Sequence, residues 1–377
     1  DGVRLEPAGL PVTEAEMDAA ARQVAPETMA ALAYAAGRIE AFHRAAMPRS
    51  WSMTDAAGSR LGQDVRPLDR VGIYVPGGRA AYPSTVLMTA VPARVAGVRE
   101  IVLVSPPGRD GALSPVVLAA ARLAGVTEAY RIGGAQAVAA LAYGTATVRR
   151  VDKIVGPGNV YVTLAKARVF GEVGIDMLAG PSEVLVIADE GADPTLAAAD
   201  LLAQAEHDPM ARAVLVTPSE RLADRVVAET QRQLGDLPRR EIAAAALAAN
   251  GAVVLVAGLG EAVELANRLA PEHLELLVAD PEALLPRVRH AGAVFLGAAT
   301  PEVVGDYVAG PDHVLPTAGT ARFSSALSTE DFVKRLSVIR YSAEGLEEAW
   351  PHLAELARVE GLAGHATAAS VRMKRTA

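Results

Sequence analysis

Short runs of apolar, often β-branched residues alternate with longer alanine-rich segments along most of this chain. The runs have the length of buried strands, and the segments between them space their apolar residues as helices do. This alternation predicts an α/β protein with parallel-rich sheets. The predicted strands are 71–75, 101–104, 128–132, 152–155, 184–188, 213–217, 252–256, 273–278 and 293–296, and the predicted helices are 85–96, 113–124, 134–142, 159–170, 194–206, 219–234, 259–269 and 281–290.

The strand–helix units fall into two blocks, and each block has enough of them for a Rossmann-like domain. A chain of 377 residues is also too long for one hydrophobic core, so two main domains are expected. Apolar residues at helical spacing in 14–46 predict a helix, and the segment after 328 is helical in pattern and comparatively charged. We predict an N-terminal helical part at 1–51 packing with the second block, Rossmann-like domains at 52–181 and 182–327, and a helical C-terminal part at 328–377.

Composition limits the classes of function. Hydrophobic residues make up 51% of the chain and charged residues 21%, which is typical of a soluble globular protein. The net charge of −8 argues against nucleic acid or an anionic membrane as the main partner. Cysteine is absent, which excludes disulfides, thiolate metal sites and a cysteine nucleophile. Neither a membrane-spanning stretch nor a secretory signal stands out, so we expect a cytoplasmic protein.

Three glycine-containing loops follow predicted strands of the first block, at 74–78, 133–136 and 156–159. Ligands of open α/β sheets bind at the carboxyl ends of strands, and glycine lets backbone amides approach a phosphate or a ribose. The sequence has no G-x-G-x-x-G motif, and each loop taken alone reads as an ordinary strand-to-helix turn. Three such loops in one block together favour a nucleotide site.

The most specific polar pattern is the run 201–207, which places Gln204 and His207 three residues apart. Residues at this spacing share a helix face, so an amide oxygen and an imidazole nitrogen can converge on one point. The pair could form half of a metal site built from N and O ligands. Taken alone, the pair is more often an exposed helical turn with a chance Gln and His.

Other polar side chains strengthen the case for a site. Four of the seven histidines fall in polar segments punctuated by Gly or Pro, whereas the other three lie in plain helical contexts. A single histidine in such a place is usually structural, but this clustering favours chemistry. Outside the run 201–207, the pairs of acid and histidine are Glu272 with His273, Asp306 with His313, and Glu360 with His365.

From Trp51 to the C-terminal helix, the sequence resembles the histidinol dehydrogenase family. The likeness runs in order through Val-Gly-Ile-Tyr-Val-Pro-Gly-Gly, Gly-Gly-Ala-Gln-Ala-Val-Ala-Ala-Leu-Ala, Lys-Ile-Val-Gly-Pro-Gly-Asn, Ala-Gly-Pro-Ser-Glu-Val-Leu-Val-Ile-Ala-Asp, Gln-Ala-Glu-His, Pro-Glu-His-Leu-Glu and His-Val-Leu-Pro-Thr. Such a string of motifs is highly specific. The resemblance implies oxidation of L-histidinol to L-histidine, the last step of histidine biosynthesis, through a bound aldehyde, with two NAD reduced and one zinc ion per subunit.

The resemblance also assigns roles to individual residues. It implies that zinc binds Gln204, His207, Asp306 and His365, that Glu272 and His273 are catalytic, that Ser182, His313 and Glu360 join the zinc ligands and His273 in contacting substrate, and that Tyr74, Gln136 and Asn159 contact NAD. His273 would be the general base and Glu272 would activate water for aldehyde oxidation. The family further implies a homodimer with shared active sites, in which the C-terminal part of one subunit contributes to the site of its partner.

Several features keep alternatives open. Family members usually carry more residues ahead of this segment, and the chain begins at Asp1, so we expect a shortened or trimmed N-terminus. Asp312 stands where Asn or Ser is common, and this carboxylate could alter substrate contacts; Asp208 stands where Gly is common. One alternative is a paralogue that oxidises another small alcohol, such as a polyol or a sulfonated diol. The other is a zinc-binding homologue without turnover.

Overall fold

The computed structural model describes residues 5–77 and 81–376. Contacts within the chain divide it into two compact units. The first unit contains residues 5–46 and 68–332, and the second contains residues 47–67 and 333–376. Both predicted Rossmann-like blocks belong to the first unit. The four-part division made from the sequence stays a proposal, in which the first unit holds more than one domain.

The first sheet carries the glycine-containing loops. Its strand order is β1-β6-β5-β4-β7-β8, and all neighbours are parallel except β1, which runs antiparallel to β6. The strands are β1 (Pro11–Val12), β4 (Arg70–Tyr74), β5 (Glu100–Ser105), β6 (Glu128–Arg131), β7 (Lys153–Val155) and β8 (Gly174–Ile175), and the helices that join them are α3 (Pro83–Ala96), α4 (Pro115–Ala124), α5 (Gly134–Tyr143) and α6 (Val160–Val169). The strand order reverses between β4 and β7, because β5 and β6 lie on one side of β4, and β7 and β8 lie on the other. The carboxyl ends of β4 and β7 are therefore the usual ligand edge.

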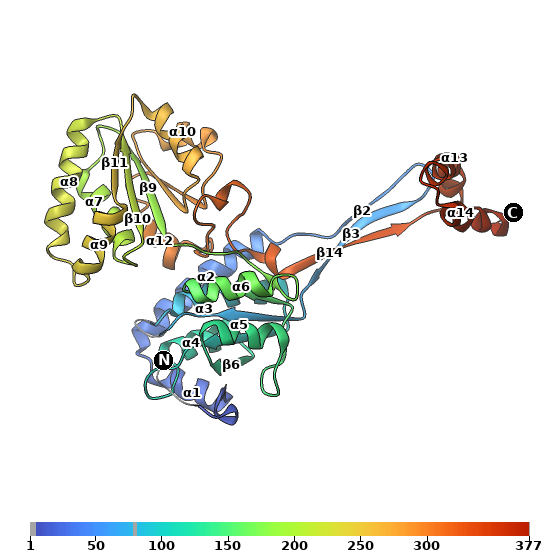
Figure 1. Ribbon diagram of the computed structural model, residues 1–377, viewed down its shortest axis with the longest axis horizontal. Helices are drawn as coiled ribbons and strands as arrows, with labels where there is room; N and C mark the ends of the chain where they lie inside the picture. Colours follow the sequence, from blue (N-terminus) through green and yellow to red (C-terminus); the bar gives the residue numbers. More distant parts are fainter. Residues whose placement is uncertain (1–4, 78–80, 377) are drawn as a thin grey trace. The chain divides into compact units, whose positions relative to one another are not determined.

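The second sheet is fully parallel, with the order β11-β10-β9-β12-β13. Its strands are β9 (Glu183–Ala188), β10 (Arg212–Thr217), β11 (Ala252–Leu255), β12 (His273–Leu277) and β13 (Ala293–Leu296), and its helices are α7 (Pro194–Ala205), α8 (Glu220–Leu234), α9 (Arg240–Asn250) and α10 (Leu259–Leu269). Alternate residues of β9 face opposite layers: Val184 and Val186 pack with α7 and α8, while Leu185 and Ile187 pack with α10. Figure 1 shows these helices on the two faces of the sheet.

The predicted fold class is confirmed, and each of the nine predicted strands lies within one residue of an observed one. Four helical segments differ from the prediction. The predicted helix 14–46 is two helices, α1 (Glu14–Gln23) and α2 (Pro26–Ala45), because Pro26 starts a new helix at its first position. The segment 281–290 contains only α11 (Pro281–Leu284) and the 3-10 turn η2 (Leu285–Arg287). The helices α9 and α12 (Glu302–Tyr307) were not predicted.

The N-terminal part contacts both blocks. On the first block, β1 pairs with β6, α1 packs on α4, and α2 packs on α3. This arrangement extends the first sheet at its edge and covers one of its helical layers. The helix α2 also touches the later loop 309–312, since the Arg38 guanidinium donates to the Ala309 carbonyl at 3.4 Å.

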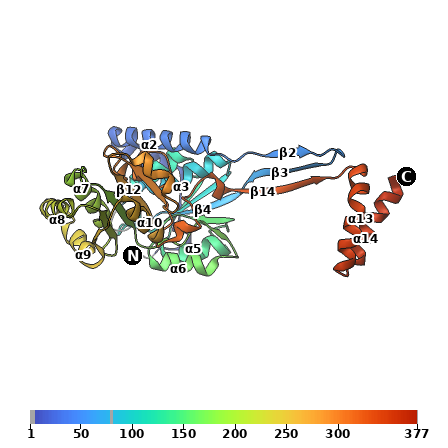
Figure 2. The ribbon, with the colours of Figure 1, turned by 90° about the horizontal axis from the view of Figure 1, so that it is seen from above.

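The second unit is a three-stranded antiparallel sheet followed by two helices. Its strands are β2 (Trp51–Thr54), β3 (Arg60–Pro67) and β14 (Val333–Arg340), in the order β14-β3-β2, and its helices are α13 (Ala343–Val359) and α14 (Ala363–Thr376). In both views α13 and α14 lie side by side (Figures 1 and 2). The predicted helical tail is therefore a strand at residues 333–340 and helical after that. None of the helices in the described part of the chain combines the length and apolar character needed to cross a membrane.

Candidate active site

Gln204 lies on the last turn of α7, a helix whose start is fixed by the Asp193 side chain accepting from the Thr195 N–H. The Gln204 side chain is fully buried, and neither atom of its amide has a hydrogen-bond partner among the described residues. His207 follows the end of the helix, where its N–H donates to the Gln204 carbonyl at 3.2 Å. An unpartnered buried amide costs free energy, so it is typical of a position that meets a ligand.

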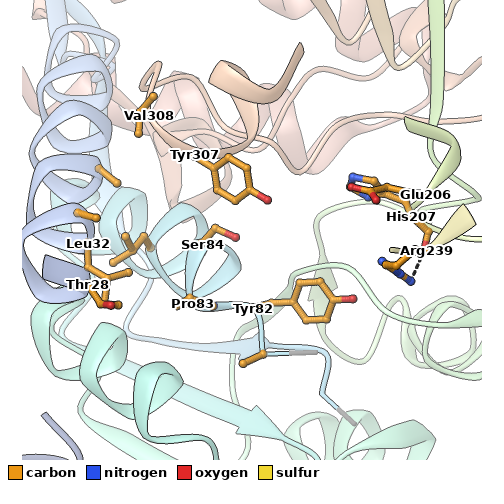
Figure 3. A pocket seen from close by; sticks show the side chains of 14 residues that line it. Thr28, Leu32, Tyr82, Pro83, Ser84, Glu206, His207, Arg239, Tyr307 and Val308 are labelled. Carbon is orange, nitrogen blue, oxygen red and sulfur yellow. Dashed lines mark hydrogen bonds between the residues drawn. The ribbon is translucent and has the colours of Figure 1, made fainter. Parts of the chain in front are cut away.

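His207 lines a cleft of about 530 Å³, which is large enough for a small molecule. Figure 3 shows His207, Glu206 and Arg239 on one side, with Tyr82, Ser84 and Tyr307 facing them. Residues of α2, the start of α3, the end of α7 and helix α12 (Glu302–Tyr307) contribute the lining. The sequence analysis had not identified Tyr82, Arg239 or Tyr307, which come from segments without a motif.

His273 is the first residue of β12, and its ring is almost completely buried. Its Nδ1 atom lies 3.1 Å from the Glu183 carbonyl oxygen on the neighbouring strand β9. A carbonyl only accepts, so Nδ1 carries the hydrogen and Nε2 keeps its lone pair. Burial lowers the pKa of His273 to about 4; the Asp306 carboxylate opposes this shift, and His207 and His313 add to it. The four side chains therefore share one electrostatic environment.

Glu272 precedes His273 and is also buried. Its Oε2 atom accepts from the Glu183 N–H at 2.8 Å and lies 3.8 Å from His273 Nδ1. Burial raises the pKa of Glu272 well above its usual value, and the neighbouring carboxylates of Glu183 and Asp306 raise it further. The carboxyl is thus more basic than that of an ordinary glutamate. Ser182 lies at the same edge, directly before β9, where its carbonyl accepts from the Arg212 N–H at 3.0 Å.

Asp306 and His313 are connected through the loop after α12. His313 Nδ1 donates to the Asp306 backbone carbonyl at 2.9 Å, and its Nε2 lies 3.5 Å from the Thr85 hydroxyl. Burial lowers the pKa of His313, Asp306 opposes the shift, and His207 adds to it. The structure therefore brings His207, His273, Asp306 and His313 into one region at the amino ends of β9 and β12.

Asp312, which stands where Asn or Ser is common, lies inside the protein next to α2. It is buried, its Oδ1 atom accepts from the Val314 N–H at 2.8 Å, and its Oδ2 atom lies 4.0 Å from His43 Nε2 on α2. Burial raises the pKa of Asp312 well above its usual value and lowers the pKa of His43 to about 4. The Asp312 carboxyl therefore faces the protein interior, next to His43.

A group of buried carboxyls beside His273 was missed by sequence analysis. Glu302 is 1% exposed, and its Oε1 atom lies 3.9 Å from His273 Nδ1. Glu275 is buried near Asp200, and burial together with the Asp200 carboxylate raises the pKa of Glu275 to about 9. The sequence indicated these carboxyls only weakly. Glu275 interrupts a predicted buried strand, and Asp200 and Glu302 resemble ordinary surface acids.

The three predicted cofactor residues lie on loops at the carboxyl edge of the first sheet. The Tyr74 hydroxyl accepts from the Gly134 N–H at 2.9 Å, which links the loops after β4 and β6. Asn159 caps α6, since its Oδ1 atom accepts from the Tyr161 and Val162 N–H groups at 3.1 and 3.2 Å. Gln136 lies in the first turn of α5. Of the predicted glycine loops, only Gly78 lies outside the described residues.

Glu360 and His365 belong to the second unit, where Glu360 ends α13 and His365 lies in the first turn of α14. Both are exposed within that unit. The four predicted zinc ligands are thus divided, with Gln204, His207 and Asp306 in the first unit. In residues 5–77 and 81–376, no group of three or more His, Asp or Glu side chains is assembled so that it could hold a metal ion.

Comparison with known proteins identifies the family. The family model described as histidinol dehydrogenase matches residues 1–373. A histidinol dehydrogenase of Synechococcus sp. is 57% identical over 99% of this chain and 86% of its own length. That of Moorella thermoacetica is 59% identical over 99% of this chain and 88% of its own length.

Solved structures agree with this family. The crystal structure of histidinol dehydrogenase from Elizabethkingia anophelis superimposes with a TM-score of 0.94 at 39% identity, covering 97% of this chain and 85% of that one. An acetylating aldehyde dehydrogenase from Geobacillus thermoglucosidasius, with a TM-score of 0.54 and 16% identity over 88% of this chain and 92% of that one, shares the fold alone. The chain belongs to the histidinol dehydrogenase family, a family of NAD-dependent oxidoreductases.

Proposed function

We propose that this chain oxidises L-histidinol to L-histidine in two NAD-linked steps at a zinc-assisted site. The observation that carries the proposal is the fully buried Gln204 amide, which has no partner among the described residues and lies one helical turn from His207. Beside this region, a buried base and a buried acid stand at the amino ends of β9 and β12. An amide, two imidazoles and carboxylates are the donor set of a zinc site without cysteine.

The donor atoms fit a zinc ion. Gln204, His207 and Asp306 of one subunit, with His365, would hold it, and bound zinc would supply Lewis acidity and orient the amino alcohol. The unpartnered Gln204 oxygen gains a partner in this arrangement, which removes the cost of its burial. NAD would bind at the carboxyl edge of the first sheet near Tyr74, Gln136 and Asn159.

His273 would serve as the general base. Its Nε2 lone pair is free at neutral pH, because its Nδ1–H is held by the Glu183 carbonyl and its pKa is about 4. Nε2 would take the proton of the substrate hydroxyl, and bound NAD would accept the hydride of the carbinol carbon, so that the alcohol becomes the aldehyde. Burial excludes water from this step and keeps the bound aldehyde from escaping.

Glu272 would serve the second half of the reaction. Aldehyde oxidation needs a water oxygen on the carbon, and a basic buried carboxyl can remove the proton of the attacking water. A second bound NAD would accept the hydride of the hydrated aldehyde, and the resulting acid would release a proton to give the carboxylate. His313 would contact the substrate, since it is fixed by Asp306 and Thr85 at the same region.

We further propose that the enzyme is a cytoplasmic homodimer with shared active sites, in which the partner subunit's His365 and the partner subunit's Glu360 complete the site. Leu356, Val359 and Leu362 surround Glu360 on the second unit and are 64%, 68% and 40% exposed. Apolar side chains grouped around a polar residue are typical of a surface that another chain covers. Glu360 could then accept a hydrogen bond from the substrate imidazole.

The test is NAD reduction with L-histidinol, L-histidinal, a polyol and a sulfonated diol, with the product identified by mass spectrometry. The proposal expects L-histidine and two NADH per histidinol, with the other alcohols far slower. Preference for a polyol or a sulfonated diol would support the paralogue instead. Absence of turnover with every alcohol in a zinc-loaded sample would support a homologue that binds metal only.

A further inference from the structure

A buried ion pair holds one of the glycine loops of the first sheet. Lys166 lies in the last turn of α6 and Asp176 follows β8; their side chains are 3% and 1% exposed, and Lys166 Nζ is bonded to Asp176 Oδ1. Both charged groups also reach Gly156, the residue directly after β7. Lys166 Nζ donates to the Gly156 carbonyl at 3.0 Å, and Asp176 Oδ2 accepts from the Gly156 N–H at 2.7 Å.

The ion pair gives the backbone N–H and carbonyl of Gly156 the hydrogen-bond partners that the sheet does not supply. Gly156 has a φ of +107°, which is outside the strand region and favours glycine. A Cβ at this position would come within 2.3 Å of the Tyr74 carbonyl oxygen, so the loop presses against the end of β4. Gly156 is buried, so its backbone N–H and carbonyl need partners. Asp176 is the partner of the N–H, and Lys166 is the partner of the carbonyl.

Stability alone does not explain this pair. A buried ion pair loses solvation, and replacing it with apolar residues of similar size is often neutral for stability. Its hydrogen bonds instead fix the loop 156–159, which leads to Asn159 and the start of α6. We propose that Lys166 and Asp176 are positioning residues that hold this loop in the conformation that receives NAD. This inference rests on the proposed NAD site at the same edge.

The matched control lies on the same strand. Lys153 begins β7 and pairs with Asp331, with Nζ 3.0 Å from Oδ1, at the end of the strand opposite Gly156. Removing that pair deletes a lysine–aspartate interaction without touching the loop. The test therefore compares Lys166→Met/Asp176→Leu with Lys153→Met/Asp331→Leu in the full-length protein.

NADH binding is measured by fluorescence titration, separately from turnover, and folding by circular dichroism. The Lys166→Met/Asp176→Leu variant should fold but bind NADH about tenfold or more weaker, the size seen when supporting residues are removed from metal sites. Its KM for NAD should rise while its KM for histidinol stays near the wild-type value. The control pair should leave both constants within about twofold of wild type.

Asp176→Asn is the milder variant, since its amide oxygen can still accept from the Gly156 N–H. It should show an NADH affinity between those of wild type and the double variant. Wild-type NADH affinity in either folded variant would overturn the inference. So would unfolding of both variants alongside a folded control, because the pair would then serve global stability. Wild-type protein that binds no NADH would instead refute the proposed cofactor site.

Discussion

His273 Nδ1 lies 3.1 Å from the Glu183 backbone carbonyl, across the point where β9 and β12 meet. The strand order reverses between these parallel strands. β10 and β11 lie on one side of β9, whereas β12 and β13 lie on the other. Ligands usually bind such sheets at the carboxyl ends of the strands. Here the buried base and acid stand at the amino ends. The second sheet thus differs from the first, whose glycine loops follow the carboxyl ends.

The tautomer set by Glu183 leads to the first prediction. His273→Asn should lower kcat for histidinol oxidation by about 100- to 10,000-fold, the usual size of general-base catalysis. The asparagine amide can still donate to the Glu183 carbonyl, so the fold should persist. Stopped-flow measurement of the first NADH formed would test this, with the melting temperature as the check on folding. A loss under twofold would remove His273 from its proposed role.

Glu272→Gln should separate the two halves of the reaction. Its amide cannot remove a proton from water, so oxidation of added histidinal should fall much more than oxidation of histidinol to the aldehyde. The Gln oxygen can keep the hydrogen bond from the Glu183 N–H, which stands at 2.8 Å in the present structure. Steady-state rates with histidinol and with histidinal would measure the two losses separately. Equal losses in both halves would contradict the assignment of water activation to Glu272.

Removal of the metal by a chelator tests whether the reaction needs zinc. Prolonged dialysis against a strong chelator should abolish NAD reduction, while far-ultraviolet circular dichroism stays near that of the untreated protein. The sheets and helices around Gln204 are held by apolar cores, so the fold does not depend on the ion. Added zinc should restore activity. Full turnover in a sample shown by elemental analysis to contain no metal would refute the zinc-assisted mechanism.

The sequence predicted the two parallel sheets because buried strands leave a strong local signal. Val184 to Ile187 form a continuous apolar run, as expected for a strand covered on both faces. The strand β14 was missed because its residues, such as Lys334 and Arg335, alternate with exposed apolar ones and have no buried partner surface of their own. Its pairing with β3 joins residues far apart in the chain, which no local pattern reveals.

Site residues in recognisable motifs could be selected from the sequence, but their surroundings could not. Nothing local distinguished Glu302 from a surface acid, although its carboxyl lies 3.9 Å from His273 Nδ1. Asp312 illustrates the reverse case. The sequence showed only that this carboxylate could alter substrate contacts, and the fold turns it toward His43 on α2. Such relationships depend on packing between distant elements.

His43 predicts how stability depends on pH. Its folded pKa of about 4 lies below the ordinary value of 6.5, because burial disfavours the charged ring. The unfolded chain therefore binds the proton more readily, and stability falls as pH drops from 6.5 to 4, by up to about 3 kcal/mol. His43→Leu should remove this part of the acid sensitivity. Urea unfolding at pH 7.5 and 4.5 would measure the loss of stability, with the exposed His352→Leu as the control. If His43→Leu kept the pH dependence of the wild type, burial of His43 would not be its cause.

Shared active sites can be tested by subunit complementation. The proposed site takes His207 from one subunit and the partner subunit's His365. His207→Ala and His365→Ala homodimers should each be nearly inactive, because every site lacks one ligand. In a mixed dimer, both lesions fall in one site and the other site is intact. Random exchange of equal amounts makes half of the dimers mixed, each with one working site of two, so activity should approach about a quarter of wild type.

The control for this experiment pairs His207→Ala with Asp306→Ala. Both residues belong to the first unit and are proposed to bind the same ion in the same site. A mixed dimer of these two variants then has one lesion in each site, and no activity should return. Exchange is verified by native mass spectrometry of differently tagged chains. If exchange is complete and the His207→Ala and His365→Ala mixture stays inactive, His365 serves the site of its own subunit, and the shared arrangement is wrong.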